Sequence, residues 1–221
     1  MKITSPNATE RVFAAELNRS YLSIEQGEPP VTGALTPLGG WCRRIFFVGA
    51  LTEVIRTEGQ VQRARLSDPT GTIDLTFRPQ NLPPADLLLT VVPPVFLALT
   101  GSIRSYGKNV VVQPDMLQLV DRQARDAWVL FTAQRTLQRM EAMKRALSGE
   151  TLDACVAAAL HHYGTSLEDL HTLAVIVQKV LMTVPPERKD PKIDPLIVVK
   201  EILAGQTTTV EVSWLLERAM E

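Results

Sequence analysis

The chain has 221 residues, of which 45% are hydrophobic, 21% charged and 5% aromatic, and its formal net charge is −1. This length allows one large or two small domains, and the composition excludes disordered, collagen-like and disulfide-rich classes. The small net charge hides a gradient, because residues 41–150 carry 14 Lys and Arg against 10 Asp and Glu, whereas residues 151–221 carry 6 against 10.

A basic unit suits a polyanion and an acidic one suits proteins, although two ordinary solvated surfaces would give the same counts. Residues 1–7 lack the apolar core of a signal peptide, and the most apolar stretch, 173–184, is too short to cross a bilayer. Cys42 and Cys155 fall in different predicted units and lack the spacing of a disulfide framework. We therefore expect a soluble, cytoplasmic protein that does not bind membranes.

The first predicted element is a short amphipathic helix over residues 8–18. Asn7 and Glu10 have the spacing of a capping box, and Val12, Phe13 and Leu17 form an apolar stripe. Residues 26–40 contain three prolines and a Gly-Gly pair, which predicts a loop without regular structure.

From Cys42 onward the pattern changes to short runs rich in β-branched and aromatic residues. Gly49 lies in the first run, where a long barrel strand can bend, and the second run ends in the turn sequence Asp-Pro-Thr-Gly at 68–71. A short helix is predicted at 85–89 within a Pro-rich connection, and a hairpin loop at 105–109. The five predicted strands are 45–55, 61–67, 72–78, 95–104 and 110–120.

Three strands, a short helical connection and a final hairpin follow the order of the OB-fold, a five-stranded Greek-key barrel, here at residues 41–121. An SH3-like barrel or an incomplete sandwich would give the same local signals, but the connection before the fourth strand favours the OB-fold. The predicted core positions include Val48, Leu66, Ile73, Leu75, Phe77, Leu97 and Val111.

Helical periodicity returns at residues 122–149 and continues in a C-terminal unit, 150–221, of four short helices: 152–163, 167–183, one beginning at Asp194-Pro195 and one near 208–211. The expected architecture is thus an N-terminal helix and loop (1–40), the barrel, a long helix and a small all-α domain. The long helix could seal the barrel, or bind other subunits through its apolar stripe. We favour a subunit interface formed by Leu130, Leu137, Met140, Met143 and Leu147.

Single strands bind in grooves that offer cations to phosphates and flat side chains to bases. Alternation along the second strand predicts that Arg63 and Arg65 point away from the barrel, while only one aromatic residue is expected to be exposed. The alternative is that scattered arginines merely keep the barrel soluble. The candidate DNA-binding residues are Arg56, Arg63, Arg65, Arg78, Tyr106 and Lys108.

The sequence resembles the archaeal OB-fold proteins associated with replication protein A, relatives of its small and middle subunits. The resemblance rests on R-V-F-A-A-E-L-N at 11–18, R-I-F-F-V-G-A-L-T-E-V at 44–54 and L-S-D-P-T-G at 66–71. It implies an OB-fold and an assembly helix within a heteromeric complex that coats single-stranded DNA in replication and repair. The C-terminal unit departs from the winged helix of the eukaryotic middle subunit because no β-wing is evident, so a reduced winged helix is an alternative to a plain helical unit.

No sequence motif indicates catalysis, since phosphate-binding loops, nucleophile elbows and zinc-protease motifs are missing. A metal site at Cys155, His161 or His162, and His171 would lack a fourth ligand, so no metal and no cofactor are expected. Two rival functions remain: an RNA- or tRNA-binding OB-fold protein, and a protein-interaction scaffold that binds no nucleic acid.

Overall fold

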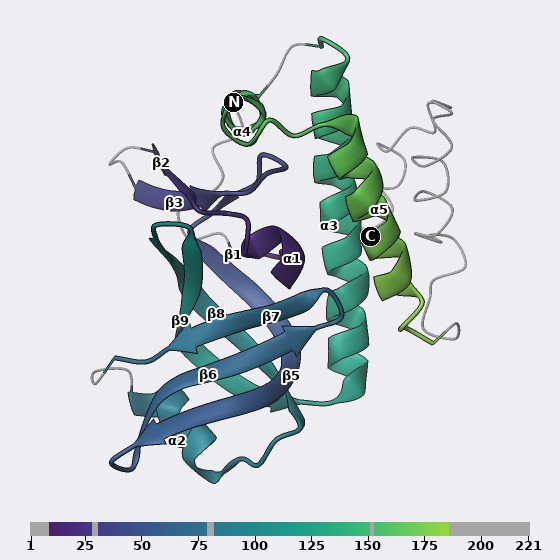
Figure 1. Cartoon of the computed structure of the whole chain (residues 1–221). Coiled ribbons are helices and arrows are strands. Elements are labelled where there is room, and N and C mark those ends of the chain that lie inside the picture. The colour runs from purple at the N-terminus through teal and green to yellow at the C-terminus, as the bar shows by residue number, and fades with distance from the viewer. Residues whose placement is uncertain (1–8, 28–30, 79–81, 151–152, 186–221) are drawn as a thin grey trace.

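The computed structural model describes residues 9–27, 31–78, 82–150 and 153–185, and Figure 1 shows their arrangement. A β-barrel lies at one end, a small sheet at the other, and a long helix runs beside both. None of the described helices is long and apolar enough to span a membrane.

Five strands close into the barrel. They are β5 (Arg44–Thr57), β6 (Gln60–Asp68), β7 (Gly71–Thr76), β8 (Val95–Tyr106) and β9 (Asn109–Val120). The strand order is β5-β6-β7-β9-β8, and β8 pairs again with β5, while β7 and β9 meet in parallel at Leu75 and Val112. This closed order is that of the OB-fold, which confirms the predicted fold class.

Gly49 is required in β5 for a close approach rather than for a bulge. A Cβ atom at this position would lie 2.8 Å from the carbonyl oxygen of Ser67 on the neighbouring strand. The irregularities in the β5–β6 register fall further along, between Leu51 and Glu53 and between Ile55 and Arg56. The strand therefore departs from regular pairing after Gly49, at residues whose side chains gave no sign of it.

The barrel interior holds most of the predicted core. Phe77 is only half-buried, although it packs against the core, and Val111 is half-buried while its neighbour Val112 is fully enclosed. Val111 pairs with the exposed Arg104 of β8, whereas Val112 pairs with the buried Ile103, so Val112 is the residue of the two that points into the barrel. The confirmed core positions are Val48, Leu66, Ile73, Leu75 and Leu97.

Two short helices pack against the barrel. α2 (Leu82–Thr90) contributes the fully buried Leu88, in the predicted position. α1 spans only Ala14–Leu17, so the predicted helix over 8–18 is wrong in length. The preceding strand β1 (Thr9–Glu10) pairs in parallel with the start of β5, which extends the chain where a helix was expected. Asn7 of the predicted capping box lies outside the described residues.

The N-terminus of α1 is capped by a distant carboxylate. Asp68, in the turn between β6 and β7, accepts a hydrogen bond from the Ala14 backbone amide through Oδ2 at 2.8 Å. Its Oδ1 accepts from Thr70 and Gly71 within its own turn. The Asp-Pro-Thr-Gly turn thus does more than reverse the chain, because it also fastens α1 against the barrel.

A three-stranded sheet occupies the region predicted as a loop, which corrects that prediction. It comprises β2 (Leu22–Gln26), β3 (Val31–Leu35) and β4 (Trp41–Cys42) in antiparallel order. The Trp41 ring lies over Gly33, where an added Cβ atom would come within 2.6 Å of it. Of the residues that suggested a loop, Pro37 and the pair Gly39-Gly40 lie in the connection between β3 and β4, whereas Pro29 and Pro30 lie outside the described residues.

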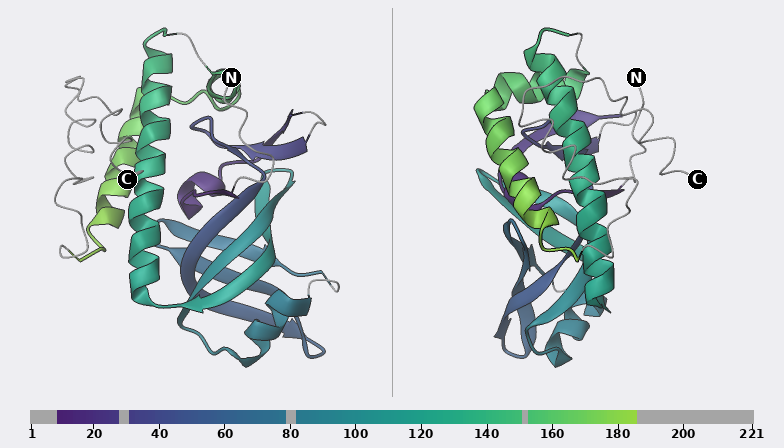
Figure 2. Two further views of the ribbon diagram at one scale, coloured as in Figure 1. Left: turned by 180° about the vertical axis from the view of Figure 1, so that it is seen from behind. Right: turned by 90° about the vertical axis from the view of Figure 1, so that its right-hand side faces the viewer.

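Three helices follow the barrel: α3 (Arg122–Leu147), α4 (Ala154–Tyr163) and α5 (Leu167–Leu181). The side chains of Asp121, Asp153 and Ser166 cap their N-termini. α5 lies along α3 in every view, and α4 lies near the small sheet (Figures 1 and 2). The two predicted helices beyond residue 185 lie outside the described residues.

The apolar stripe of α3 packs within this chain. Leu137, Met140 and Met143 are buried, whereas Leu130 and Leu147 are half-buried. The stripe is therefore not an open subunit interface, because its central side chains already contact their own chain. It does not simply seal the barrel either: the buried residues of the barrel, the N-terminal segment and the three helices form one continuous core.

Candidate nucleic-acid interface

The outer face of β5, β6 and β7 carries two aligned rows of side chains. Backbone pairing places Glu53, Arg65 and Asp74 opposite one another in the first row. In the second row, Arg63 on β6 pairs with Ile55 on β5 and Thr76 on β7. Ala64, between the two arginines, is buried, so Arg63 and Arg65 point outward as predicted.

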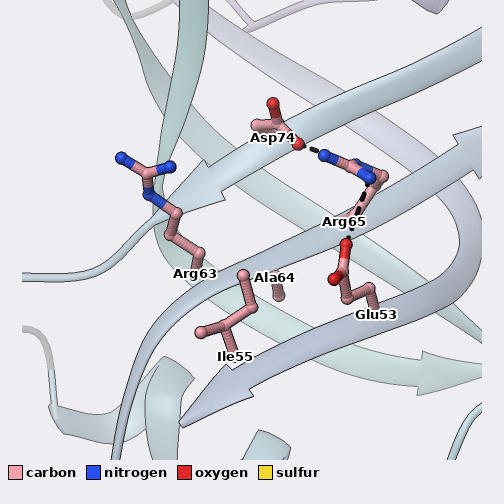
Figure 3. Close-up of a pocket in the computed structure, with 6 residues that line it drawn as sticks. All are labelled: Glu53, Ile55, Arg63, Ala64, Arg65 and Asp74. Carbon is pink, nitrogen blue, oxygen red and sulfur yellow. Dashed lines mark hydrogen bonds and ion pairs between the residues drawn. The ribbon is translucent and has the colours of Figure 1, made fainter. Parts of the chain in front are cut away.

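Arg65 is held between two carboxylates (Figure 3). Its Nη1 lies 3.1 Å from Glu53 Oε2, and its Nε donates to Asp74 Oδ1 at 2.9 Å. The hydrogen bond to Asp74, with the charges of Asp74 and Glu53, raises the pKa of the Arg65 guanidinium above its usual value. The row of one cation and two anions carries a net charge of −1, so Arg65 adds no positive potential to the face.

Arg63 differs from Arg65 because it makes no ion pair or hydrogen bond within the described residues. It borders a shallow hollow that it shares with the first row, Ile55 and Ala64 (Figure 3). The hollow encloses about 270 Å³ including open solvent, which is less than a typical small-molecule pocket. Such a surface suits one unit of an extended ligand better than a whole small molecule.

The remaining predicted site residues are dispersed. Arg56 donates from Nη2 to the carbonyl oxygen of Leu88 at 2.7 Å, which ties it to α2. Arg78 is exposed just beyond β7, and Tyr106 and Lys108 are exposed at the β8–β9 hairpin, with the Tyr106 residue 62% exposed. The structure thus groups Arg63 with Arg65 and Tyr106 with Lys108, while Arg56 has a structural partner.

Sequence reasoning missed the roles of Glu53 and Asp74. The predicted set contained no carboxylate, whereas Glu53 and Asp74 bracket Arg65 and line the hollow. Asp74 could have been placed beside Arg65 by counting outward from the Asp68–Gly71 turn, because hairpin register fixes this pair. Glu53 could not be placed by counting from the β5–β6 turn, because the irregularity between Ile55 and Arg56 shifts the register of that hairpin.

A second exposed aromatic residue lies away from this face. Phe131 on α3 is 57% exposed, and the Arg11 guanidinium carbon lies 6.0 Å from its ring centroid and 5.1 Å from that of Phe46. Phe46 is in register with Thr100 on β8, and Thr100 with the exposed Met116 on β9. Arg11 thus connects the rings of Phe131 and Phe46, and these three residues, with Met116 two strands from Phe46, are called here the Phe131 patch.

The described residues contain no cluster of three or more histidine, cysteine or acidic side chains that could hold a metal ion. His161, His162 and His171 are all exposed on the helices. Cys155 Sγ accepts a hydrogen bond from Gln26 Nε2 at 2.6 Å. The His162 ring packs edge-on against Tyr21 and Tyr163, so its contacts are those of a packing residue.

No family model and no curated protein matches the chain. Among solved structures, a chain of a replication protein A heterotrimer bound to ssDNA is similar, with 16% identity, a TM-score of 0.46, and coverage of 60% of this chain and 98% of that one. A chain of the S. pombe Stn1–Ten1 complex is similar with 17% identity and a TM-score of 0.41, and the match covers 55% of this chain and 84% of that one. Asparaginyl-tRNA synthetase from Pyrococcus horikoshii has 10% identity and a TM-score of 0.36, and the match covers 63% of this chain and 34% of that one. The fold assignment rests on the strand order and closure described above.

Proposed function

We propose that this protein is a non-catalytic, cytoplasmic subunit of a replication protein A-like complex that binds single-stranded DNA. The observation that carries the proposal is the outer face of β5–β7, where Arg63 is exposed beside a shallow hollow and has no ion-pair partner among the described residues. OB-folds use this face and the loops beside it for extended oligomeric ligands. The resemblance of residues 11–18, 44–54 and 66–71 supports the choice of DNA and of an archaeal complex in replication and repair.

The charge balance of the face implies modest affinity for the chain alone. Arg65 is neutralised by its carboxylates and Arg56 is tied to α2. Of the predicted set, this leaves Arg63, Arg78 and Lys108 as cations without an ion pair to the part of the chain that the structure describes. Tyr106 is the single predicted ring available for stacking, a contact worth about 1–3 kcal/mol per base. Other subunits would therefore supply much of the affinity of the complex.

Fluorescence anisotropy with labelled oligo-dT at several salt concentrations tests the proposal. Arg63→Ala and Lys108→Ala should each weaken binding and flatten the slope of log affinity against log salt by about 0.7, because each removes one phosphate contact. Arg145→Ala, an exposed cation in the last turn of α3, is the matched control and should leave the slope unchanged. Equal effects of all three variants would show that the interface is not on this face. A preference for oligo-U over oligo-dT would favour the RNA-binding alternative.

A further inference from the structure

The first row, Glu53, Arg65 and Asp74, can still bind a ligand, because one oxygen of each carboxylate is not used in its ion pair with Arg65. Arg65 engages Glu53 Oε2 and Asp74 Oδ1. Glu53 Oε1 and Asp74 Oδ2 have no donor among the described residues, and both carboxylates are about half exposed, at 47% and 51%. The row thus fixes two carboxylate acceptors beside a guanidinium that faces solvent (Figure 3).

The rest of the hollow adds an apolar surface and a cation to the row. Ile55, which is 43% exposed, offers an apolar surface for a ring face. Arg63 lies in the adjoining row as a free cation for the phosphate of the same nucleotide. Arg65 holds the carboxylates in position before any ligand arrives, so little side-chain entropy is lost on binding.

We propose that the Glu53–Arg65–Asp74 row selects bases that carry an exocyclic amino group, with cytosine favoured over uracil or thymine. Cytosine presents an amino donor at N4, and carboxylates accept from it, while guanidinium N–H groups donate to its ring acceptors. Uracil and thymine present a carbonyl oxygen in place of that amino group, which places two acceptors face to face. The inference rests on the proposed function, since it assigns base preference to the same face.

Oligo-dC and oligo-dU of equal length test this, because the two bases differ at the amino or carbonyl group that the row would contact. The measurement is made at low salt and mildly alkaline pH, where cytosine is uncharged. The wild-type protein should bind oligo-dC about ten-fold more tightly, near the lower end of the range for one polar base contact. Glu53→Gln and Asp74→Asn should tighten binding to both oligomers by removing an anion, and should bring the dC-to-dU ratio towards one.

Glu58→Gln is the matched control. Glu58 is an exposed carboxylate in the turn between β5 and β6, outside the row, and its replacement removes the same charge. It should change both affinities equally and preserve the wild-type ratio. A wild-type ratio near one, or a ratio that survives both row variants, overturns the base preference and leaves single-strand binding intact. If neither oligomer binds at low salt, the proposed function itself fails.

Discussion

At the scale of single residues, two ion pairs of this protein differ in burial. Arg65 lies on the surface, 45% exposed, where its two partners position it and add little stability. Arg139 on α3 is 12% exposed, and its partner Glu16 on α1 is 1% exposed. Burial alone lowers the pKa of Arg139, but the adjacent Glu16 carboxylate more than offsets this, so the pKa lies above its usual value.

The Glu16–Arg139 pair predicts a strongly non-additive mutant cycle. Glu16→Gln or Arg139→Met alone leaves one buried charge without its partner, which should cost about 3–5 kcal/mol of unfolding free energy. The double variant should cost less than either single change, because no unpaired charge remains. It should not recover fully, since Arg139 also donates to the Arg11 carbonyl oxygen and to Thr136. Denaturant unfolding of the four proteins measures the coupling, and additive losses would contradict it.

At the scale of elements, α3 has two apolar surfaces with different roles. Met140 is 1% exposed and belongs to the core, while Phe131 is 57% exposed and belongs to the Phe131 patch. The stripe identified from sequence periodicity was the buried one, because amphipathic spacing marks which side chains share a face but not what covers that face. In this protein α5 lies along α3, through buried residues such as Leu170 and Val177.

Substitutions on the two surfaces should therefore separate stability from assembly. Met140→Ser should lower the unfolding free energy by about 2–5 kcal/mol, as expected for a truncated core side chain. Phe131→Ser should leave stability almost unchanged and reduce recovery of partner subunits in a pull-down from native extract. Full recovery with Phe131→Ser would remove the Phe131 patch from assembly. A large stability loss from the same variant would show that Phe131 is structural.

The barrel could be predicted from sequence because its strands are long, its alternation is regular and its turns carry specific residues. The small sheet of β2, β3 and β4 could not, because β4 is two residues long and its partner strand contains Gly33. Gly33 fits in this strand because the Trp41 ring packs directly over it, where a larger side chain would clash. The candidate site was predictable in part. Alternation along β6 placed Arg63 and Arg65 on the outer face, and the regular β6–β7 hairpin places Asp74 beside Arg65, whereas the position of Glu53 depends on the irregular β5–β6 register.

At the scale of the whole molecule, Cys42 offers a probe of global unfolding. Its side chain is enclosed where β4 meets the shared core, and burial raises the pKa of its thiol. Cys155 is half-buried. Burial raises the pKa of its thiol, and the hydrogen bond that Gln26 donates to its sulfur opposes this increase. In native protein, a thiol alkylating reagent should therefore modify Cys155 first. Cys42 should react at the rate of global unfolding, measured by mass spectrometry over time. Rapid labelling of Cys42 in native buffer would contradict a single cooperative core.

Several contacts that hold the N-terminal segment come from much later in the chain. Leu35 accepts a hydrogen bond from Tyr163, Pro37 accepts one from Thr165, and Glu16 pairs with Arg139. As the ribosome makes the protein from its N-terminus, the strands of the small sheet emerge long before these partners exist. The barrel can form from neighbouring segments as they appear, whereas the N-terminal sheet must wait until translation has passed Thr165. The N-terminal segment is thus made first but completes its contacts late, and a nascent chain halted before Arg139 would lack the cation that pairs with Glu16.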